Sequence, residues 1–135
     1  MKKLEHIGIA VKDLEKANAV FSRLLGLSPY KTEEVESEGV RTSFFELSGL
    51  KIELLAATRP DSPIARFLEK RGEGIHHLAF MVDNLEQKTK TLQQSGFKMI
   101  NERPKKGADQ KMINFLHPQN TCGVLVEICK EIDDA

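Results

Sequence analysis

The chain has 135 residues, which is enough for one domain or for two small modules that share a core. Apolar residues make up 40% and charged residues 30% of it, a balance typical of soluble globular proteins. Lys and Arg together number 20 and so do Asp and Glu, so the formal net charge is zero and we expect neither nucleic acid nor a membrane as a partner.

The first predicted strand belongs to a segment that occurs twice. The segments 6–15 and 77–86 align without gaps at an offset of 71 residues. Each begins with a His, continues as an alternating apolar run and ends in a Leu-Glu pair that opens a helical pattern. The repeat indicates a duplicated unit in which His6 and His77 hold the same place.

The rest of the first half predicts one helix and three strands. Apolar residues recur at helical spacing from Leu14 to Leu25, with Asp13 as the N-cap and Gly26 as the stop. Strand-like runs follow at 30–35, 41–47 and 51–55, with a turn at Ser48-Gly49 between the last two. Residues 57–74 then read as a connection containing a short helix, started by Asp61 or Ser62 and stopped by Gly72.

The second half repeats this order. A weaker helical pattern runs from Leu85 to Leu92, capped by Asp83 or Asn84 and ended by Gly96. Strand-like runs follow at 98–101, 112–116 and 124–129. Each half therefore reads β-α-β-β-β, and we predict an α+β fold of two such modules in tandem. We expect a single domain over residues 1–135, with module 1 at about 4–56, a linker helix at about 57–74 and module 2 at about 75–130.

The two His side chains are predicted to face a cavity. Side chains alternate between the two faces of a strand, so His6 shares a face with Gly8 and Ala10, opposite the branched residues. A His followed by small residues leaves space and suits a cavity wall better than a packed core. In the second copy the same parity selects His77 over its neighbour His76.

Acidic residues interrupt the last apolar strand of each half. Glu53 lies 53 − 6 = 47 residues after the first His, and Glu127 lies 127 − 77 = 50 residues after the second. A carboxylate in a buried strand is costly unless it is paired or coordinated. Two His and two Glu from the two halves would offer mixed N/O ligands to Co²⁺, Zn²⁺, Mn²⁺, Ni²⁺ or Fe²⁺, with positions left open for a substrate.

The chain resembles the vicinal oxygen chelate (glyoxalase/bleomycin resistance/dioxygenase) superfamily, and within it most closely the methylmalonyl-CoA epimerases. The resemblance covers nearly the whole chain, and its distinctive segments are 62–68, 72–80 and 114–118. It implies paired βαβββ modules that form a curved mixed sheet around a metal-containing cavity. It also implies that His6, His77 and Glu127 are metal ligands, with Glu53 in the fourth position.

The activity that the resemblance implies is metal-dependent epimerisation of (R)/(S)-methylmalonyl-CoA by an isomerase. The substrate's carboxylate and thioester oxygens would chelate a divalent ion, Co²⁺ before Zn²⁺, Mn²⁺ or Ni²⁺, which acidifies the proton between them through a stabilised enolate. Glu127 is the catalytic candidate and doubles as a ligand. No organic cofactor is implied. A homodimer is expected from the resemblance alone, and a cytoplasmic location from the absence of a leader segment and of paired Cys spacing.

The second acid/base group has no clear candidate in the sequence. In a characterised branch of the family a Glu follows a Gly-Val pair, and here Gly39-Val40 leads to Thr42 at that place. Thr is a poor base. Glu46 shares the strand face of Thr42 and is a weaker alternative.

Other functions stay open at this point. A glyoxalase-like lyase acting on a thiol adduct would use the same kind of metal chemistry, whereas a ring-cleaving dioxygenase with a His₂-Glu iron site would leave Glu53 without a ligand role. A non-catalytic small-molecule binding protein would need the cavity but not the metal. The loop 102–107 could meet CoA phosphates or be a solvated turn, and His117 is expected to cap its loop rather than to bind metal.

Overall fold

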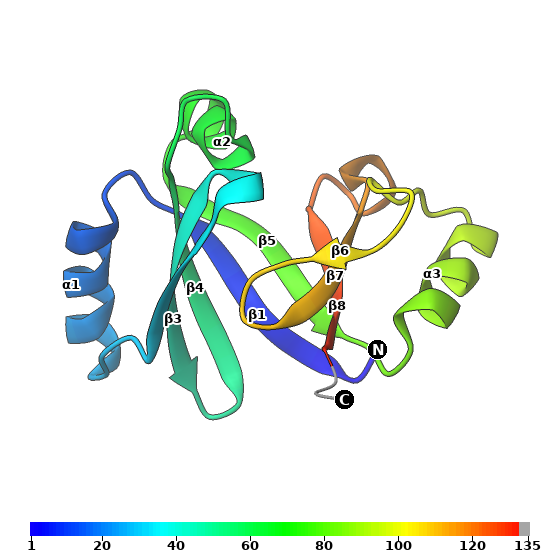
Figure 1. The fold of residues 1–135 in the computed structure, drawn as a ribbon, viewed down its shortest axis with the longest axis horizontal. Coiled ribbons are helices and arrows are strands. Elements are labelled where there is room, and N and C mark those ends of the chain that lie inside the picture. The colour runs from blue at the N-terminus through cyan, green and yellow to red at the C-terminus, as the bar shows by residue number, and fades with distance from the viewer. Residues whose placement is uncertain (133–135) are drawn as a thin grey trace. The chain divides into compact units, whose positions relative to one another are not determined.

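The computed structural model describes residues 1–132, and the chain divides into two compact units (Figure 1). The first unit is His6–His76, and the second combines Met1–Glu5 with the chain from His77 onward. Within the described residues, none of the helices has the length and apolar character needed to cross a membrane.

The first unit contains a β-α-β-β-β arrangement followed by a further helix. Its elements are β1 (Lys3–Ala10, of which Lys3–Glu5 belong to the second unit), α1 (Leu14–Leu25), β2 (Lys31–Val35), a 3-10 turn (Glu36–Glu38), β3 (Val40–Leu47), β4 (Leu50–Ala57) and α2 (Pro63–Arg71). The strand order is β2-β3-β4-β1. β1 and β4 are parallel, and the other neighbours are antiparallel, so the sheet is mixed.

The second unit repeats this arrangement. Its elements are β5 (Gly74–Met81), α3 (Leu85–Gln94), β6 (Lys105–Lys106), β7 (Lys111–Leu116), a 3-10 turn (Pro118–Asn120) and β8 (Val126–Glu131). The order β6-β7-β8-β5 matches the first unit, and β5 and β8 are again the parallel pair. The α+β class and the two βαβββ modules predicted from the sequence are confirmed.

One predicted strand is wrong. Residues 98–101 form only a single bridge, between Met99 and Leu116, and the strand in this place is Lys105–Lys106. This strand lies at the sheet edge, where it pairs only with β7. A two-residue edge strand has no apolar periodicity, so nothing in the sequence could mark it.

In the first unit, α1 and α2 pack on opposite faces of the four strands, which are called the first sheet below. α1 packs on one face, where Leu14 meets Phe45 and Leu54, as Figure 1 shows for the helix beside β3 and β4. α2 covers part of the other face, where Ile64 meets Leu55 and Val40. Because side chains alternate along a strand, further residues of β3 and β4 point to the α2 face outside the cluster around Ile64. These residues are available for a site.

A close approach fixes the turn between β2 and β3. Gly39 has a φ of 63°, and a Cβ at this position would lie 2.8 Å from the Cβ of Ser62. The Arg59 guanidinium donates hydrogen bonds to the carbonyls of Glu36 and Ser37. The start of β3 is therefore held against the N-terminus of α2 by the backbone as well as by side chains.

Substitution of the α3 N-cap tests which of two candidate residues starts that helix. The Asn84 side chain accepts a hydrogen bond of 3.0 Å from the Gln87 amide, whereas Asp83 forms an ion pair with Lys2 on the surface. We expect Asn84→Ala to lower the free energy of unfolding by about 1 kcal/mol in urea titrations. Asp83→Ala, the matched control, should change it by less than about 0.5 kcal/mol, because exposed ion pairs contribute little. A larger loss in the control would contradict the assignment.

Burial of His76 makes the stability of the first unit depend on pH. Its ring packs edge-on against Phe67, with centroids 4.9 Å apart, and burial lowers the pKa of its imidazole from 6.5 to about 4. As the pH falls below about 6.5 the unfolded chain takes up a proton that the folded chain accepts only near pH 4. This contribution to stability is therefore full above pH 6.5 and is lost as the pH falls towards 4.

We expect the free energy of unfolding to fall more steeply between pH 6.5 and 4 in the wild type than in His76→Asn. The difference should reach on the order of 3 kcal/mol at the acid end, since each pKa unit corresponds to about 1.4 kcal/mol. Denaturant titrations of the metal-free protein at a series of pH values measure it. Equal pH slopes for the two proteins would refute the prediction.

Candidate active site

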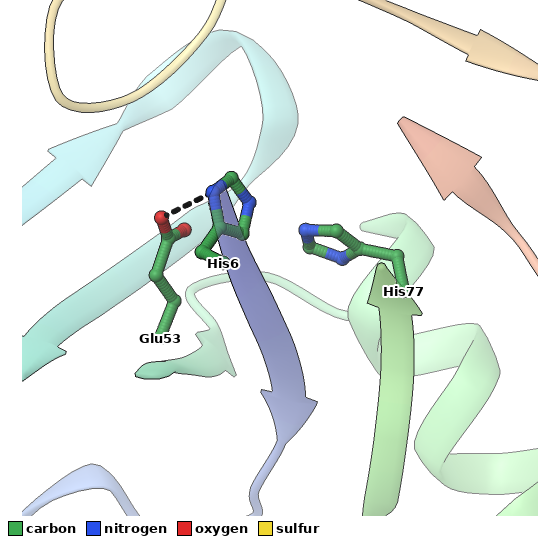
Figure 2. Close-up of side chains that lie close together, drawn as sticks. All are labelled: His6, Glu53 and His77. Carbon is green, nitrogen blue, oxygen red and sulfur yellow. Dashed lines mark ion pairs between the residues drawn. The ribbon is translucent and has the colours of Figure 1, made fainter. Parts of the chain in front are cut away.

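The first unit buries one His beside one Glu. Nδ1 of His6 lies 3.0 Å from Oε2 of Glu53, and the two residues are only 4% and 5% exposed (Figure 2). The parallel pairing of β1 with β4 causes this, because Gly8 lies directly opposite Glu53 and shares its face with His6. The Glu53 carboxylate therefore lies on the face of β1 that carries His6 and Gly8.

The second unit contains the equivalent pair. Nε2 of His77 lies 3.5 Å from Oε1 of Glu127, with exposures of 5% and 4%. In the parallel pairing of β5 with β8, Ala79 lies directly opposite Glu127, and it is two residues after His77 as Gly8 is after His6. The two modules therefore place their His–Glu pairs by the same strand register.

A Phe stands on the other side of each Glu. Phe44 on β3 lies opposite Glu53, and Phe115 on β7 lies opposite Glu127. The Phe115 ring also meets the His77 ring edge-on, with centroids 5.8 Å apart at 89°. Each carboxylate is therefore set between a small residue and an aromatic one, which limits its access to water from the flanking strands.

The sequence carried a sign of these aromatic residues that the predictions did not use. Phe44 and Phe115 are 115 − 44 = 71 residues apart, the same offset as 77 − 6 = 71 for the two His. Pairing residues at the repeat offset, rather than comparing the His segments alone, would have found them.

Burial gives these side chains a chemistry that exposed ones lack. A buried carboxylate is costly unless it is paired, and each Glu here lies beside an imidazole. An imidazole nitrogen and a carboxylate oxygen are also ligands suited to Zn²⁺, Co²⁺, Mn²⁺ and Ni²⁺. The donor types at each pair fit such an ion.

The structure places the remaining candidates away from these pairs or without a ligand role. His76 points to Phe67, not to Glu127. His117 is exposed and accepts a hydrogen bond of 3.2 Å from the Gln119 amide at Nδ1, which confirms the predicted capping of its loop. Glu46 lies exposed near the far end of β3, opposite Lys51.

Thr42 is buried on the same face of the first sheet as Glu53. Glu53 lies opposite Phe44, and Thr42 is two residues from Phe44 on the same strand. Thr42 and Glu53 are therefore diagonal neighbours on one face. The Thr42 side chain is fully buried, which distinguishes it from the exposed Glu46 four residues further along β3.

Most of the chain matches one known protein family. Residues 5–115 match the model of the Glyoxalase/Bleomycin resistance protein/Dioxygenase superfamily. The chain belongs to that superfamily. The resemblance predicted from the sequence is confirmed.

Relatives and solved structures narrow the placement within the superfamily. The chain is 39% identical to the uncharacterized protein YqjC of Bacillus subtilis, over 99% of this chain and 96% of the relative. It is also 39% identical to the mitochondrial methylmalonyl-CoA epimerase of Homo sapiens, over 93% of this chain and 72% of the relative. A solved methylmalonyl-CoA epimerase, in complex with methylmalonyl-CoA and NH4+, is 31% identical with a TM-score of 0.91, covering 97% and 95% of the two chains. The protein is therefore placed with the epimerases of its superfamily, which are isomerases.

Proposed function

We propose that the protein epimerises (R)- and (S)-methylmalonyl-CoA with a divalent metal ion. One observation carries the proposal: two buried His–Glu pairs, in matching strand register, in a chain related to methylmalonyl-CoA epimerases. That one such relative was solved with methylmalonyl-CoA supports an acyl-CoA substrate.

His6, Glu53, His77 and Glu127 would together hold the ion. His6, Glu53 and His77 each offer one ligand atom of a type that binds divalent metals. Two neutral imidazoles and two carboxylates balance the charge of a divalent ion, so the set can be buried with the ion at no net charge. When bound, the ion supplies Lewis-acid stabilisation of the negative charge that develops on the substrate's carbonyl oxygens. Co²⁺ is the ion we propose first, with Zn²⁺, Mn²⁺ and Ni²⁺ as substitutes.

The chain's own groups would move the proton. The carbon between the carboxylate and the thioester loses a proton to a carboxylate of the site, and Glu127 is the group we propose for this transfer. The aromatic rings of Phe44 and Phe115 beside the two carboxylates would exclude water from the enolate. Return of a proton to the opposite side of that carbon inverts its configuration.

Metal removal and proton exchange test the proposal. The purified protein is treated with a chelator and reloaded separately with Co²⁺, Zn²⁺, Mn²⁺ or Ni²⁺, and each sample is incubated in deuterated solvent with one methylmalonyl-CoA epimer. We expect deuterium at the α-carbon and the second epimer in reloaded samples but not in the metal-free one. Activity on a hemithioacetal alone would favour a lyase, and an absence of metal uptake would favour a binding protein. Either result would overturn the proposal.

A homodimer and a cytoplasmic location belong to the same proposal. Cys122 is exposed, and the buried Cys129 directs its thiol to the Phe80 carbonyl instead of a disulfide partner. Two reduced thiols suit a reducing compartment. Light scattering of the purified protein measures the oligomeric state directly.

A further inference from the structure

One buried hydroxyl on the Glu53 face has no hydrogen-bond partner. Thr42 is fully buried, and among residues 1–132 its Oγ1 meets no donor or acceptor. A buried hydroxyl left unpaired costs about 1–3 kcal/mol, and Val would occupy the same volume at no such cost. A Thr at this position is therefore favourable only if its hydroxyl forms a hydrogen bond with a group from outside residues 1–132.

The strand register shows what this hydroxyl faces. Thr42 lies opposite Leu55 on β4, and the next pair on the same face is Phe44 with Glu53. Diagonal neighbours of this kind have Cα atoms about 7–8 Å apart. The Thr42 side chain therefore lies within the span of a small molecule bound at the Glu53 carboxylate.

A second unpaired hydroxyl lies on the opposite face and serves as a comparison. Ser43 is also fully buried, and its hydroxyl has no partner within residues 1–132, but it lies opposite Leu54, a member of the apolar cluster under α1. Both hydroxyls are packed by apolar neighbours, but they lie on opposite faces: Ser43 is on the α1 face, and Thr42 shares the α2 face with Glu53.

We propose that Thr42 is a substrate-binding residue, whose hydroxyl donates a hydrogen bond to an oxygen of the acyl group bound at the Glu53 face. The inference rests on the proposed function, because it takes a carboxy-thioester as the ligand. A Thr hydroxyl is too weak a base to remove the α-proton, so its role is to orient the acyl oxygens. The orphan hydroxyl is then satisfied when the substrate is present.

Binding by three variants, Thr42→Val, Thr42→Ser and Ser43→Ala, tests the inference. The metal-loaded proteins are titrated calorimetrically with malonyl-CoA, which carries the acyl oxygens, and with coenzyme A, which lacks them. We expect Thr42→Val to raise the Kd for malonyl-CoA about 10-fold or more, the loss of one hydrogen bond to a charged acceptor, and to leave the Kd for coenzyme A unchanged. Thr42→Ser keeps the hydroxyl and should stay within about 3-fold of the wild type, as should Ser43→Ala.

Thermal unfolding separates binding from folding. Loss of an unpaired hydroxyl should leave the Tm of Thr42→Val equal to or above that of the wild type. An unchanged Kd for malonyl-CoA in Thr42→Val, an equal change for coenzyme A, or a wild type that does not bind malonyl-CoA would overturn the inference. A wild type that binds malonyl-CoA through Thr42 but exchanges no α-proton would instead overturn the proposed epimerase activity and leave the hydroxyl's role established.

Discussion

Glu53→Ala is expected to abolish metal binding and, with it, proton exchange at the substrate's α-carbon. The variant removes a buried carboxylate that we propose as a ligand, and it leaves His6 without its neighbouring carboxylate. Loss of groups that merely orient metal ligands already lowers affinity about 10–100-fold, so loss of a ligand should exceed about 100-fold. Metal content by mass spectrometry and the rate of deuterium incorporation measure the two effects.

Two variants control this experiment. Glu53→Gln keeps a carbonyl oxygen at the same place and should retain metal, because a side-chain amide oxygen can still bind a divalent ion. Glu46→Ala removes an exposed carboxylate from the neighbouring strand and should alter neither metal content nor rate. Saturating Co²⁺ should also raise the Tm of the wild type but not of Glu53→Ala, since an ion at 100 times its Kd stabilises a fold by about 2.7 kcal/mol. Normal metal content in Glu53→Ala would show that Glu53 is not a ligand.

Glu127→Gln is expected to separate metal binding from proton transfer. The amide can still offer an oxygen to the ion but cannot accept a proton, so the metal content should stay near that of the wild type. The rate of α-proton exchange should fall by about 10²–10⁴-fold, the usual contribution of a positioned acid/base group. Epimer conversion and deuterium incorporation, measured on the same sample, report the loss.

Glu131→Gln is the matched control on the same strand. Glu131 is exposed at the end of β8, on the same side as Glu127 by strand parity, and should tolerate the change. If Glu127→Gln exchanged the α-proton at the wild-type rate, Glu127 would be at most a ligand and the base would have to be sought elsewhere.

The paired His–Glu arrangement was accessible from the sequence because it depends on strand parity. Once 6–11 and 77–82 are read as strands, alternation puts each His on the face with small residues, and a Glu in an apolar strand needs a partner. These inferences require only the period of a strand. The register that sets Gly8 beside Glu53 depends on pairing between distant segments, which the sequence does not display.

Other features were out of reach for physical reasons. That Asn84 and not Asp83 caps α3 depends on backbone angles, because both side chains can accept the same hydrogen bond. That the Thr42 hydroxyl lacks a partner within the described part of the chain depends on tertiary packing, which the sequence does not display. The edge strand Lys105–Lys106 owes its place to pairing with β7 and has no pattern of its own.

The matching strand registers have a consequence for changes in chain length. From His to Phe both modules count 38 residues (44 − 6 and 115 − 77), but from Phe to Glu they count 9 (53 − 44) and 12 (127 − 115). Since Phe44 and Glu53 are opposite one another, and so are Phe115 and Glu127, the three extra residues lie in the β7–β8 connection around Pro118–Asn120. Insertions there are tolerated because the ladders on either side keep their alignment. A single residue inserted between Phe and Glu within a strand would turn that carboxylate to the opposite face of its sheet.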